Sequence, residues 1–151
     1  EKGPADMAEA VAARSEASDI VVMCSAVADY TPTHYSPQKV KKSDGELSIP
    51  LARTTDILHT LGMKKKEGQM LVGFSMETEN LIENSRKKLS KKNADIICAN
   101  TIADGGDTGF AVDTNQVTLI TETEVITLPL CTKEETADLI LSHIVELQKE
   151  K

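Results

Sequence analysis

Three short apolar runs recur along the chain, and each leads into small or polar residues. They are Ile20–Cys24, Gln69–Phe74 and Ala94–Asn100. A short apolar run without alternation is typical of a strand in a parallel sheet whose two faces are both covered. We therefore expect three buried parallel strands, with Ile20–Cys24 in the interior of the sheet.

Apolar residues at helical spacing predict helices between and after these strands. The first runs from Asp6 to about Ser18, and a short one, Ile57–Leu61, is capped by Thr55 or Asp56 and ended by Gly62 or Gly68. A third covers residues 77–92, with an inner stripe of Leu81, Ile82, Ser85 and Leu89. The last begins at a capping box, residues 132–135, and is expected to bury Ala137, Ile140, Leu141, Ile144, Val145 and Leu147.

Two alternating segments, Gln116–Ile120 and Glu124–Leu128, flank a short polar turn and predict a β-hairpin. Glu46–Ile49 also alternates and predicts a short strand, whereas Tyr30–Asp44 shows no periodicity and predicts a long loop. Helices alternating with parallel strands give a fold class of α/β. We expect a Rossmann-like three-layer parallel sheet with a C-terminal β-hairpin at one edge.

Composition narrows the class of protein. A chain of 151 residues predicts a single domain, residues 1–151. Its net charge of −7 argues against non-specific binding to nucleic acid or to an anionic membrane surface, and no apolar run is long enough to span a bilayer. The three cysteines are far apart, which fits neither a disulfide framework nor a zinc site. They are expected to be buried, in a cytoplasmic protein.

Candidate chemistry gathers after the first apolar run. Ser25, Ala26 and Ala28 leave room for a ligand beside the backbone, and Asp29 supplies a carboxylate. Lysines follow at positions 39, 41 and 42, and an extended backbone would point Lys39 and Lys41 the same way. Ligands of open α/β sheets bind beyond the carboxyl ends of the strands. This stretch therefore predicts a site for a polyanion that carries a sugar or a metal, although Asp29 could instead cap a turn and the lysines could be a solvated charge run.

Two further candidates lie beyond the second strand. Lys88 and Lys92 are four residues apart, so they project from one face of the predicted helix. They could grip an anion or simply be solvated at a helix end. Phe74 follows Gly73 at a strand end, where its ring could stack on a base or belong to the core. Asn100 ends the third strand and is either a turn former or a group that positions substrate.

Several of these stretches, in this order, resemble one family. They are Ala26–Tyr30, Lys39–Lys42, Val72–Phe74 with Glu77-Thr78, Lys88 to Asn93, and Ile97–Asn100. Together they resemble phosphopantothenoylcysteine synthetase, the ligase of coenzyme A biosynthesis, which in many bacteria is the second half of a bifunctional synthetase and decarboxylase. That family has an earlier strand-helix-strand portion with a glycine-rich phosphate loop, and the resemblance implies that residues 1–151 are a synthetase domain without this portion.

The resemblance implies roles for individual residues. It places the nucleotide against Met23, Cys24, Ser25, Asp29, Lys39, Ala52, Arg53, Thr54, Thr55, Phe74, Lys88 and Lys92. The segments Met23–Ser25 and Ala52–Thr55 would contact it mainly through backbone, and Thr54-Thr55 replaces the Asn-Pro pair of many members. Lys39 and Ala26 would be catalytic, with Lys39 stabilising developing charge, and Asp29 is a possible ligand of nucleotide-bound Mg²⁺.

The function implied by the resemblance is ligation of 4′-phosphopantothenate with L-cysteine, driven by CTP and Mg²⁺ through an acyl-cytidylate. FMN would be required only if a decarboxylase domain lies upstream. The family tends to form dimers, so a homodimer is expected, with the edge hairpin as a plausible interface.

Two other classes of function stay open, together with the choice between CTP and ATP. An NAD(P)-dependent oxidoreductase could share the architecture, and a G-x-G-x-x-G after the first strand would favour it, but this chain has none. A noncatalytic nucleotide-binding or regulatory module could also keep the fold. Loss of Lys39 or Asp29 would have favoured that reading, and both are present.

Overall fold

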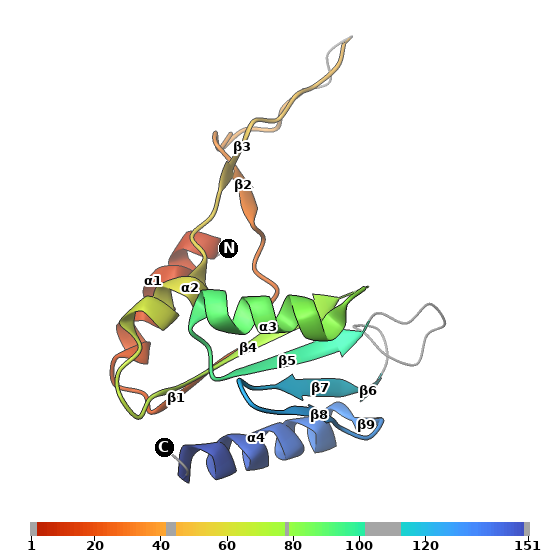
Figure 1. Ribbon diagram of the computed structural model, residues 1–151. Helices are drawn as coiled ribbons and strands as arrows, with labels where there is room; N and C mark the ends of the chain where they lie inside the picture. Colours follow the sequence, from red (N-terminus) through yellow and green to blue (C-terminus); the bar gives the residue numbers. More distant parts are fainter. Residues whose placement is uncertain (1–2, 42–44, 78, 102–112, 150–151) are drawn as a thin grey trace.

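The computed structural model describes residues 3–41, 45–77, 79–101 and 113–149. Its centre is a five-stranded sheet in the order β1-β4-β5-β7-β8 (Figure 1). The strands are β1 (Ile20–Met23), β4 (Met70–Glu77), β5 (Ile96–Thr101), β7 (Val117–Ile120) and β8 (Val125–Thr127). The first three run parallel, and the antiparallel β7–β8 hairpin completes the edge. The predicted fold class and C-terminal hairpin are confirmed.

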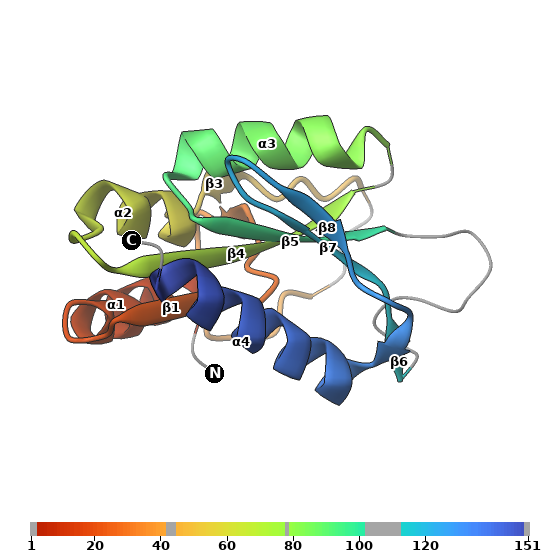
Figure 2. The ribbon, with the colours of Figure 1, turned by 60° about the horizontal axis from the view of Figure 1, so that its bottom comes forward.

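In the part of the chain that the structure describes, four helices cover the two faces of the sheet. They are α1 (Pro4–Ser15), α2 (Ile57–Lys64), α3 (Leu81–Lys92) and α4 (Lys133–Lys149). Figure 1 shows α4 on one face of the sheet and α1, α2 and α3 on the other, which makes three layers, and Figure 2 shows α4 from the face that it covers.

Alternate residues of each central strand fill the two cores. On β4, Met70 and Val72 belong to the core beside α4, whereas Leu71 belongs to the core beneath α1, α2 and α3. On β5, Ile97 is fully buried, and its neighbours Ile96 and Cys98 face the α4 side. Both faces of these strands are dry, which explains why the apolar runs do not alternate.

Local sequence signals fix where the helices begin. The Asp56 carboxylate accepts a hydrogen bond of 3.0 Å from the His59 N–H and so caps α2. At α4, the Thr132 N–H donates to the Glu135 carboxylate at 2.9 Å, and the Glu135 N–H donates to the Thr132 hydroxyl at 3.2 Å. This reciprocal pair is the predicted capping box.

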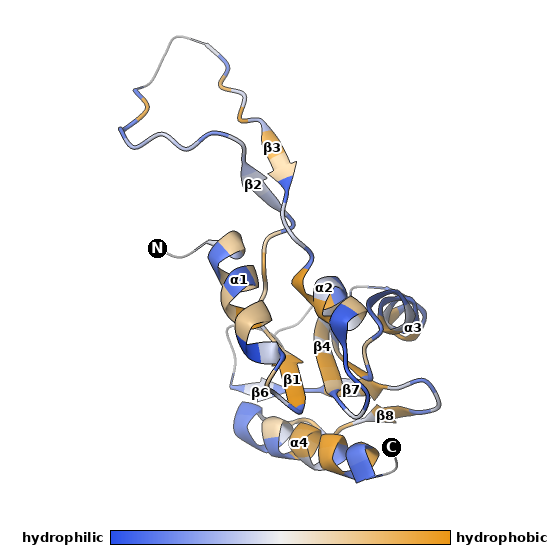
Figure 3. Cartoon of the chain, turned by 90° about the vertical axis from the view of Figure 1, so that its left-hand side faces the viewer, coloured by the Kyte–Doolittle hydropathy of each residue, from blue (hydrophilic) through white to orange (hydrophobic). Residues whose placement is uncertain are grey.

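A narrow arm projects from the body of the molecule (Figure 3). Its base is an antiparallel pair of strands, β2 (Tyr30–Pro32) and β3 (Leu51–Arg53), outside the central sheet. A second small antiparallel pair, β6 (Thr114–Asn115) with β9 (Cys131–Thr132), precedes α4. Tyr30–Asp44 is therefore not entirely loop, and the predicted strand Glu46–Ile49 is wrong, because the paired backbone begins only at Leu51.

Three other predictions need correction. Among the described residues β1 is the outer strand of the sheet, and Val22 is 38% exposed, because an apolar run shows that faces are covered but not which edge is paired. Gly62 lies inside α2 instead of ending it. The third helix begins only at Leu81, since Glu77 still pairs with Thr101 in the sheet.

Parts of two predicted helix faces are also wrong. On α4, Ile140 and Ile144 are buried, but Ala137, Leu141 and Val145 face outward. On α3, Ile82 is exposed whereas Ser85 and Leu89 are buried. Apolar residues span more than one stripe of each helix, so the packing against the sheet decides which stripe is buried.

Candidate functional site

A cavity of about 190 Å³ lies beyond the carboxyl end of β1 and beside β4, and ligands of open α/β sheets bind beyond such strand ends. It is bounded by the segment after β1, the start of α2 and one face of α3. Eight of the predicted nucleotide-binding residues line it: Met23, Ser25, Asp29, Thr54, Thr55, Phe74, Lys88 and Lys92. The fold thus gathers residues from four separate stretches of the sequence at one place.

Thr54 holds the segment that carries Asp29. Its hydroxyl donates to the Ala28 carbonyl at 2.6 Å, and its backbone N–H donates to the Asp29 carbonyl at 2.9 Å. These two bonds fasten the chain after β1 to the end of β3. The departure from the Asn-Pro pair therefore places a hydroxyl where it fixes the backbone beside Asp29.

Lys92 forms an ion pair with Asp56 at the wall of the cavity. Burial by itself raises the pKa of Asp56, but hydrogen bonds from Lys92 and from the His59 backbone outweigh it, so the pKa lies below its ordinary 3.8. The His59 ring shares a 3.0 Å hydrogen bond with the Lys91 carbonyl and so joins α2 to α3. Asp56, which the sequence marked only as a helix cap, is thus also part of the site.

Lys88 makes the second ion pair of the site. Its Nζ lies 2.7 Å from Glu77 Oε1, and the amide of Asn84 donates to Glu77 Oε2 at 3.2 Å. The Glu77 side chain is only 12% exposed, whereas that of Lys88 is 43% exposed. Lys88 is consequently fixed from the sheet side while it lines the cavity.

Phe74 lies inside β4 and not at the strand end predicted for it, because β4 continues to Glu77. It lines the cavity and also contacts the core beside α4. The neighbouring Gly73 serves packing and not a ligand, because a Cβ there would lie 2.5 Å from Leu58 Cδ2. The Leu58 side chain of α2 therefore occupies the space that a side chain at this position would need.

Five predicted site residues do not line this cavity. Cys24, Ala26 and Ala52 are exposed outside its walls, and Lys39 lies in the exposed arm. Arg53 is at the base of the arm, with its guanidinium carbon 5.9 Å from the centre of the Tyr30 ring. Lys42 and Thr78 lie outside the described residues.

Of the three cysteines, only Cys98 is buried as predicted. Burial, with a smaller contribution from Cys24, raises the pKa of the Cys98 thiol to about 12. Cys24 is exposed because it follows the outer strand. Asn100 is the next-to-last residue of β5, which ends at Thr101, and its Oδ1 is buried without a hydrogen-bond partner among the described residues.

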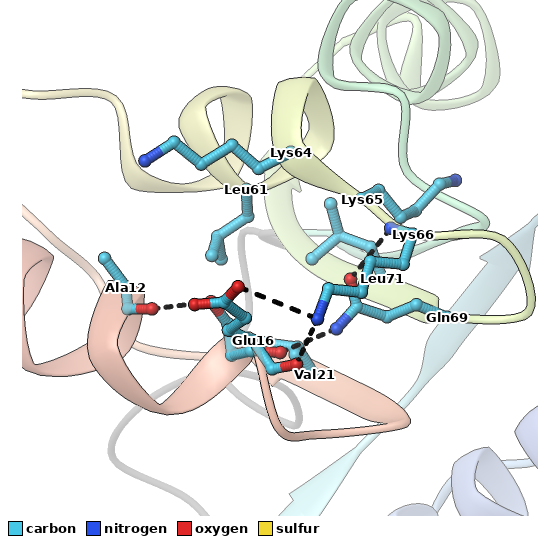
Figure 4. Close-up of a pocket in the computed structure, with 10 residues that line it drawn as sticks. Ala12, Glu16, Val21, Leu61, Lys64, Lys65, Lys66, Gln69 and Leu71 are labelled. Carbon is cyan, nitrogen blue, oxygen red and sulfur yellow. Dashed lines mark hydrogen bonds and ion pairs between the residues drawn. The ribbon is translucent and has the colours of Figure 1, made fainter.

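A larger cavity, about 380 Å³, lies between the last turns of α1 and α2 (Figure 4). Several of its polar groups bind backbone carbonyls of the segment that ends α1. Gln69 donates to the carbonyls of Ser15 and Ser18 at 2.7 Å each, and Lys66 donates to the Glu16 carbonyl at 2.7 Å. These bonds satisfy carbonyls at the end of α1, so we assign this cavity to structure and the smaller one to function.

Sequence reasoning missed the two carboxylates Glu77 and Asp56 as parts of the site. Glu77 was noticed only within the Glu77-Thr78 motif, and Asp56 only as a cap. The signal that was available is position, because both residues lie where an element ends or begins at the carboxyl edge of the sheet.

Relatives with known names match nearly the whole chain. The coenzyme A biosynthesis bifunctional protein CoaBC of Bacillus subtilis is 46% identical over 147 residues, which are 97% of this chain and 36% of that protein. The CoaBC protein of Escherichia coli K12 is 36% identical over 149 residues, again 97% of this chain and 36% of the relative. The chain thus spans about a third of the length of these curated relatives.

Solved structures of CoaBC and Cab2 proteins have a similar fold. The C-terminal domain of CoaBC superposes with a TM-score of 0.76 at 39% identity, covering 97% of this chain and 63% of that one. A Cab2 variant in complex with phosphopantothenate-cysteine shares the fold alone, with a TM-score of 0.73, 14% identity and coverage of 97% and 51%. The family model of the DNA/pantothenate metabolism flavoprotein C-terminal domain matches residues 2–147. Because that match covers nearly the whole chain, the chain belongs to the DNA/pantothenate metabolism flavoprotein C-terminal domain family.

Proposed function

We propose that this chain is the synthetase part of a phosphopantothenate–cysteine ligase of coenzyme A biosynthesis and that its cavity binds CTP. One observation supports this most strongly. Eight residues expected to contact the nucleotide line one cavity at the carboxyl end of β1, and they come from β1 and the segment after it, the segment after β3, the middle of β4, and α3. The names of the relatives in the same family agree with this activity.

The charges around the cavity favour a nucleotide that arrives with a divalent cation. Lys88 and Lys92 are each paired with a carboxylate, and Asp29 adds a further negative charge. A triphosphate would meet little net positive charge there, so Mg²⁺ would be needed to neutralise it. Asp29 offers the hard oxygen ligand that Mg²⁺ prefers and would hold the ion together with the phosphates of the nucleotide, because both oxygens of Asp56 are already engaged by the His59 N–H and by Lys92.

The proposed reaction has two steps. A carboxylate oxygen of 4′-phosphopantothenate attacks the α-phosphorus of CTP, and the bond from that phosphorus to pyrophosphate breaks. The amine of L-cysteine then attacks the carbonyl carbon of the mixed anhydride, the bond to CMP breaks, and the amine loses a proton. Lys39, Lys88 and Lys92 would stabilise the negative charge of the first step. Backbone groups of Met23–Ser25 would read the edge of the pyrimidine.

Lys39 would reach this chemistry from the arm. The arm exposes several apolar side chains, which have no cover in a single copy: Tyr35 is 89% exposed, Leu47 70% and Val40 63%. Such exposure marks an interaction surface. We propose that the chain works as a homodimer and that the arm is the interface, in preference to the β7–β8 hairpin, where Val125 is only 38% exposed.

The test is calorimetric titration of CTP and of ATP, each with Mg²⁺, into this chain and into a longer chain that includes the upstream portion of the relatives. We expect a preference for CTP that weakens roughly tenfold or more in Lys88→Ala, since a charged hydrogen bond is lost. Lys87→Ala is the matched control, because Lys87 pairs with Glu83 on the exposed face of the same helix. Lys39→Ala should reduce formation of phosphopantothenoylcysteine, measured by mass spectrometry.

Two results would overturn this function: a longer chain that ignores CTP, or one that binds NADPH instead. The second would revive the oxidoreductase alternative. Binding of CTP by the longer chain without formation of product would favour the noncatalytic module.

A further inference from the structure

One face of α3 lies beside two carboxylates, those of Glu77 and Asp56. Asn84, Lys88 and Lys92 repeat every four residues, so they form a single stripe on the helix. Opposite this stripe are Glu77 at the end of β4 and Asp56 at the start of α2. The stripe therefore connects the cavity to a carboxylate that does not line it, Glu77.

Both oxygens of Glu77 are occupied by groups from this stripe. Lys88 Nζ lies 2.7 Å from Oε1, and Asn84 Nδ2 lies 3.2 Å from Oε2. Asn84 is itself held, because its amide also donates to the Glu79 carbonyl at 3.1 Å. The carboxylate consequently has a fixed orientation, and it fixes the end of the Lys88 side chain.

The Lys87–Glu83 pair on α3 is a useful comparison, because it has the same chemistry as the Lys88–Glu77 pair but a different exposure to solvent. Lys87 and Glu83 are also 2.7 Å apart, but their side chains are 69% and 67% exposed. Solvent screens such a pair, and it restrains neither side chain strongly. The Glu77 side chain is 12% exposed, so its pair with Lys88 is much less screened. The same chemistry therefore restrains Lys88 and leaves Lys87 free to move.

We propose that Glu77, oriented by Asn84, is a positioning residue that holds Lys88 at the cavity wall for the phosphate groups of the ligand. This deepens the proposed function and rests on it. An ammonium group has three N–H donors. One donates to Glu77, and two remain for a ligand in the cavity that Lys88 lines. A lysine fixed in this way loses less conformational freedom on binding than a free one.

The test uses changes that leave the charge of the site unaltered. Glu77→Asp keeps the carboxylate but shortens it by one methylene, which withdraws it from Lys88. Asn84→Ala removes the second anchor and keeps a good helix former. We expect each to weaken the binding of CTP and of inorganic tripolyphosphate by roughly three- to tenfold, because Lys88 must then be ordered by the ligand. Calorimetry measures both affinities, and thermal unfolding checks that each variant is folded.

The deciding measurement repeats Glu77→Asp and Asn84→Ala in a Lys88→Met background. If they act through Lys88, their effect on affinity disappears there, whereas a merely structural effect would persist. Glu83→Asp is the matched control and should leave both affinities unchanged, since it makes the same change in the exposed pair with Lys87.

The outcomes separate the two hypotheses. A parent chain that binds tripolyphosphate but not CTP, even with the upstream portion present, contradicts the proposed function, and tripolyphosphate still reports on Glu77. Unchanged affinities in Glu77→Asp and Asn84→Ala, or equal losses with and without Lys88, overturn the positioning role. A parent chain that binds neither ligand overturns both.

Discussion

Gly62 joins α2 to the end of α3, and replacing it by alanine should destabilise the protein. A Cβ at this position would lie 1.8 Å from the Lys92 carbonyl oxygen and 2.8 Å from its carbon. These are backbone atoms, so no side-chain rotation relieves the contact. The Asn93 amide also donates to the Gly62 carbonyl at 2.9 Å, and this bond holds α2 against the end of α3.

The magnitude follows from two opposing effects. Alanine is favoured over glycine inside a helix by about 1 kcal/mol. Against this, the two helices must separate by roughly 1.6 Å to reach the 3.4 Å of ordinary contact, and this loosens the core that Ile57, Leu61 and Leu89 form between them. Overpacking of this kind costs about 1–3 kcal/mol, and more where backbone must move. We therefore expect the free energy of unfolding to fall by about 2 kcal/mol and the Tm by about 4–8 °C.

Urea denaturation gives the free energy of unfolding, and a thermal scan gives the Tm. Gly45→Ala is the control, because a Cβ there meets nothing within 4 Å, and we expect no measurable change. An unchanged or raised Tm in Gly62→Ala would refute the reasoning, since the gain in helix propensity would then exceed the cost of the contact with α3.

Three other outcomes follow from ionisable groups. Asp95→Asn should lower the free energy of unfolding in urea by about 3 kcal/mol, because it leaves Lys65, whose side chain is only 14% exposed, without a charged partner; a loss below about 1 kcal/mol would contradict this. A maleimide at pH 8 should label Cys24 in the native protein but reach Cys98, whose pKa is raised to about 12, only after unfolding; prompt native labelling of Cys98 would be the contrary result. The lowered pKa of Asp56 means that it stabilises the fold above pH 3.8 and that this contribution is lost as the pH falls through the folded value. Acid unfolding should therefore be less steep in Asp56→Asn, and an identical pH profile would disprove that account.

Much of the fold could be predicted from the sequence because the signals are local. The apolar runs at β1, β4 and β5, the alternation at β7 and β8, and the capping box at Thr132 each depend on neighbouring residues. The buried faces of α4 could be predicted only in part. Leu141 and Ile144 look alike in the pattern, and only the sheet determines which of them is covered.

The candidate site could likewise be predicted only in part from the sequence. Lys88 and Lys92 could be placed on one helix face from their spacing alone, and Asp29 at a strand end from the run before it. Their partners could not be predicted, because Glu77 and Asp56 belong to other elements.

The sequence by itself thus determined the strands, the hairpin and the residues that carry charge, since periods of two and of about 3.6 residues are properties of the local backbone. Only the tertiary structure decided that β1 lies outermost among the described strands, that Lys39 lies on an arm and that each site lysine is paired with a carboxylate. Those facts depend on which segments meet in space. The strength of an ion pair depends on its burial. Neither the meeting of distant segments nor the burial of a pair can be read from a single stretch of sequence.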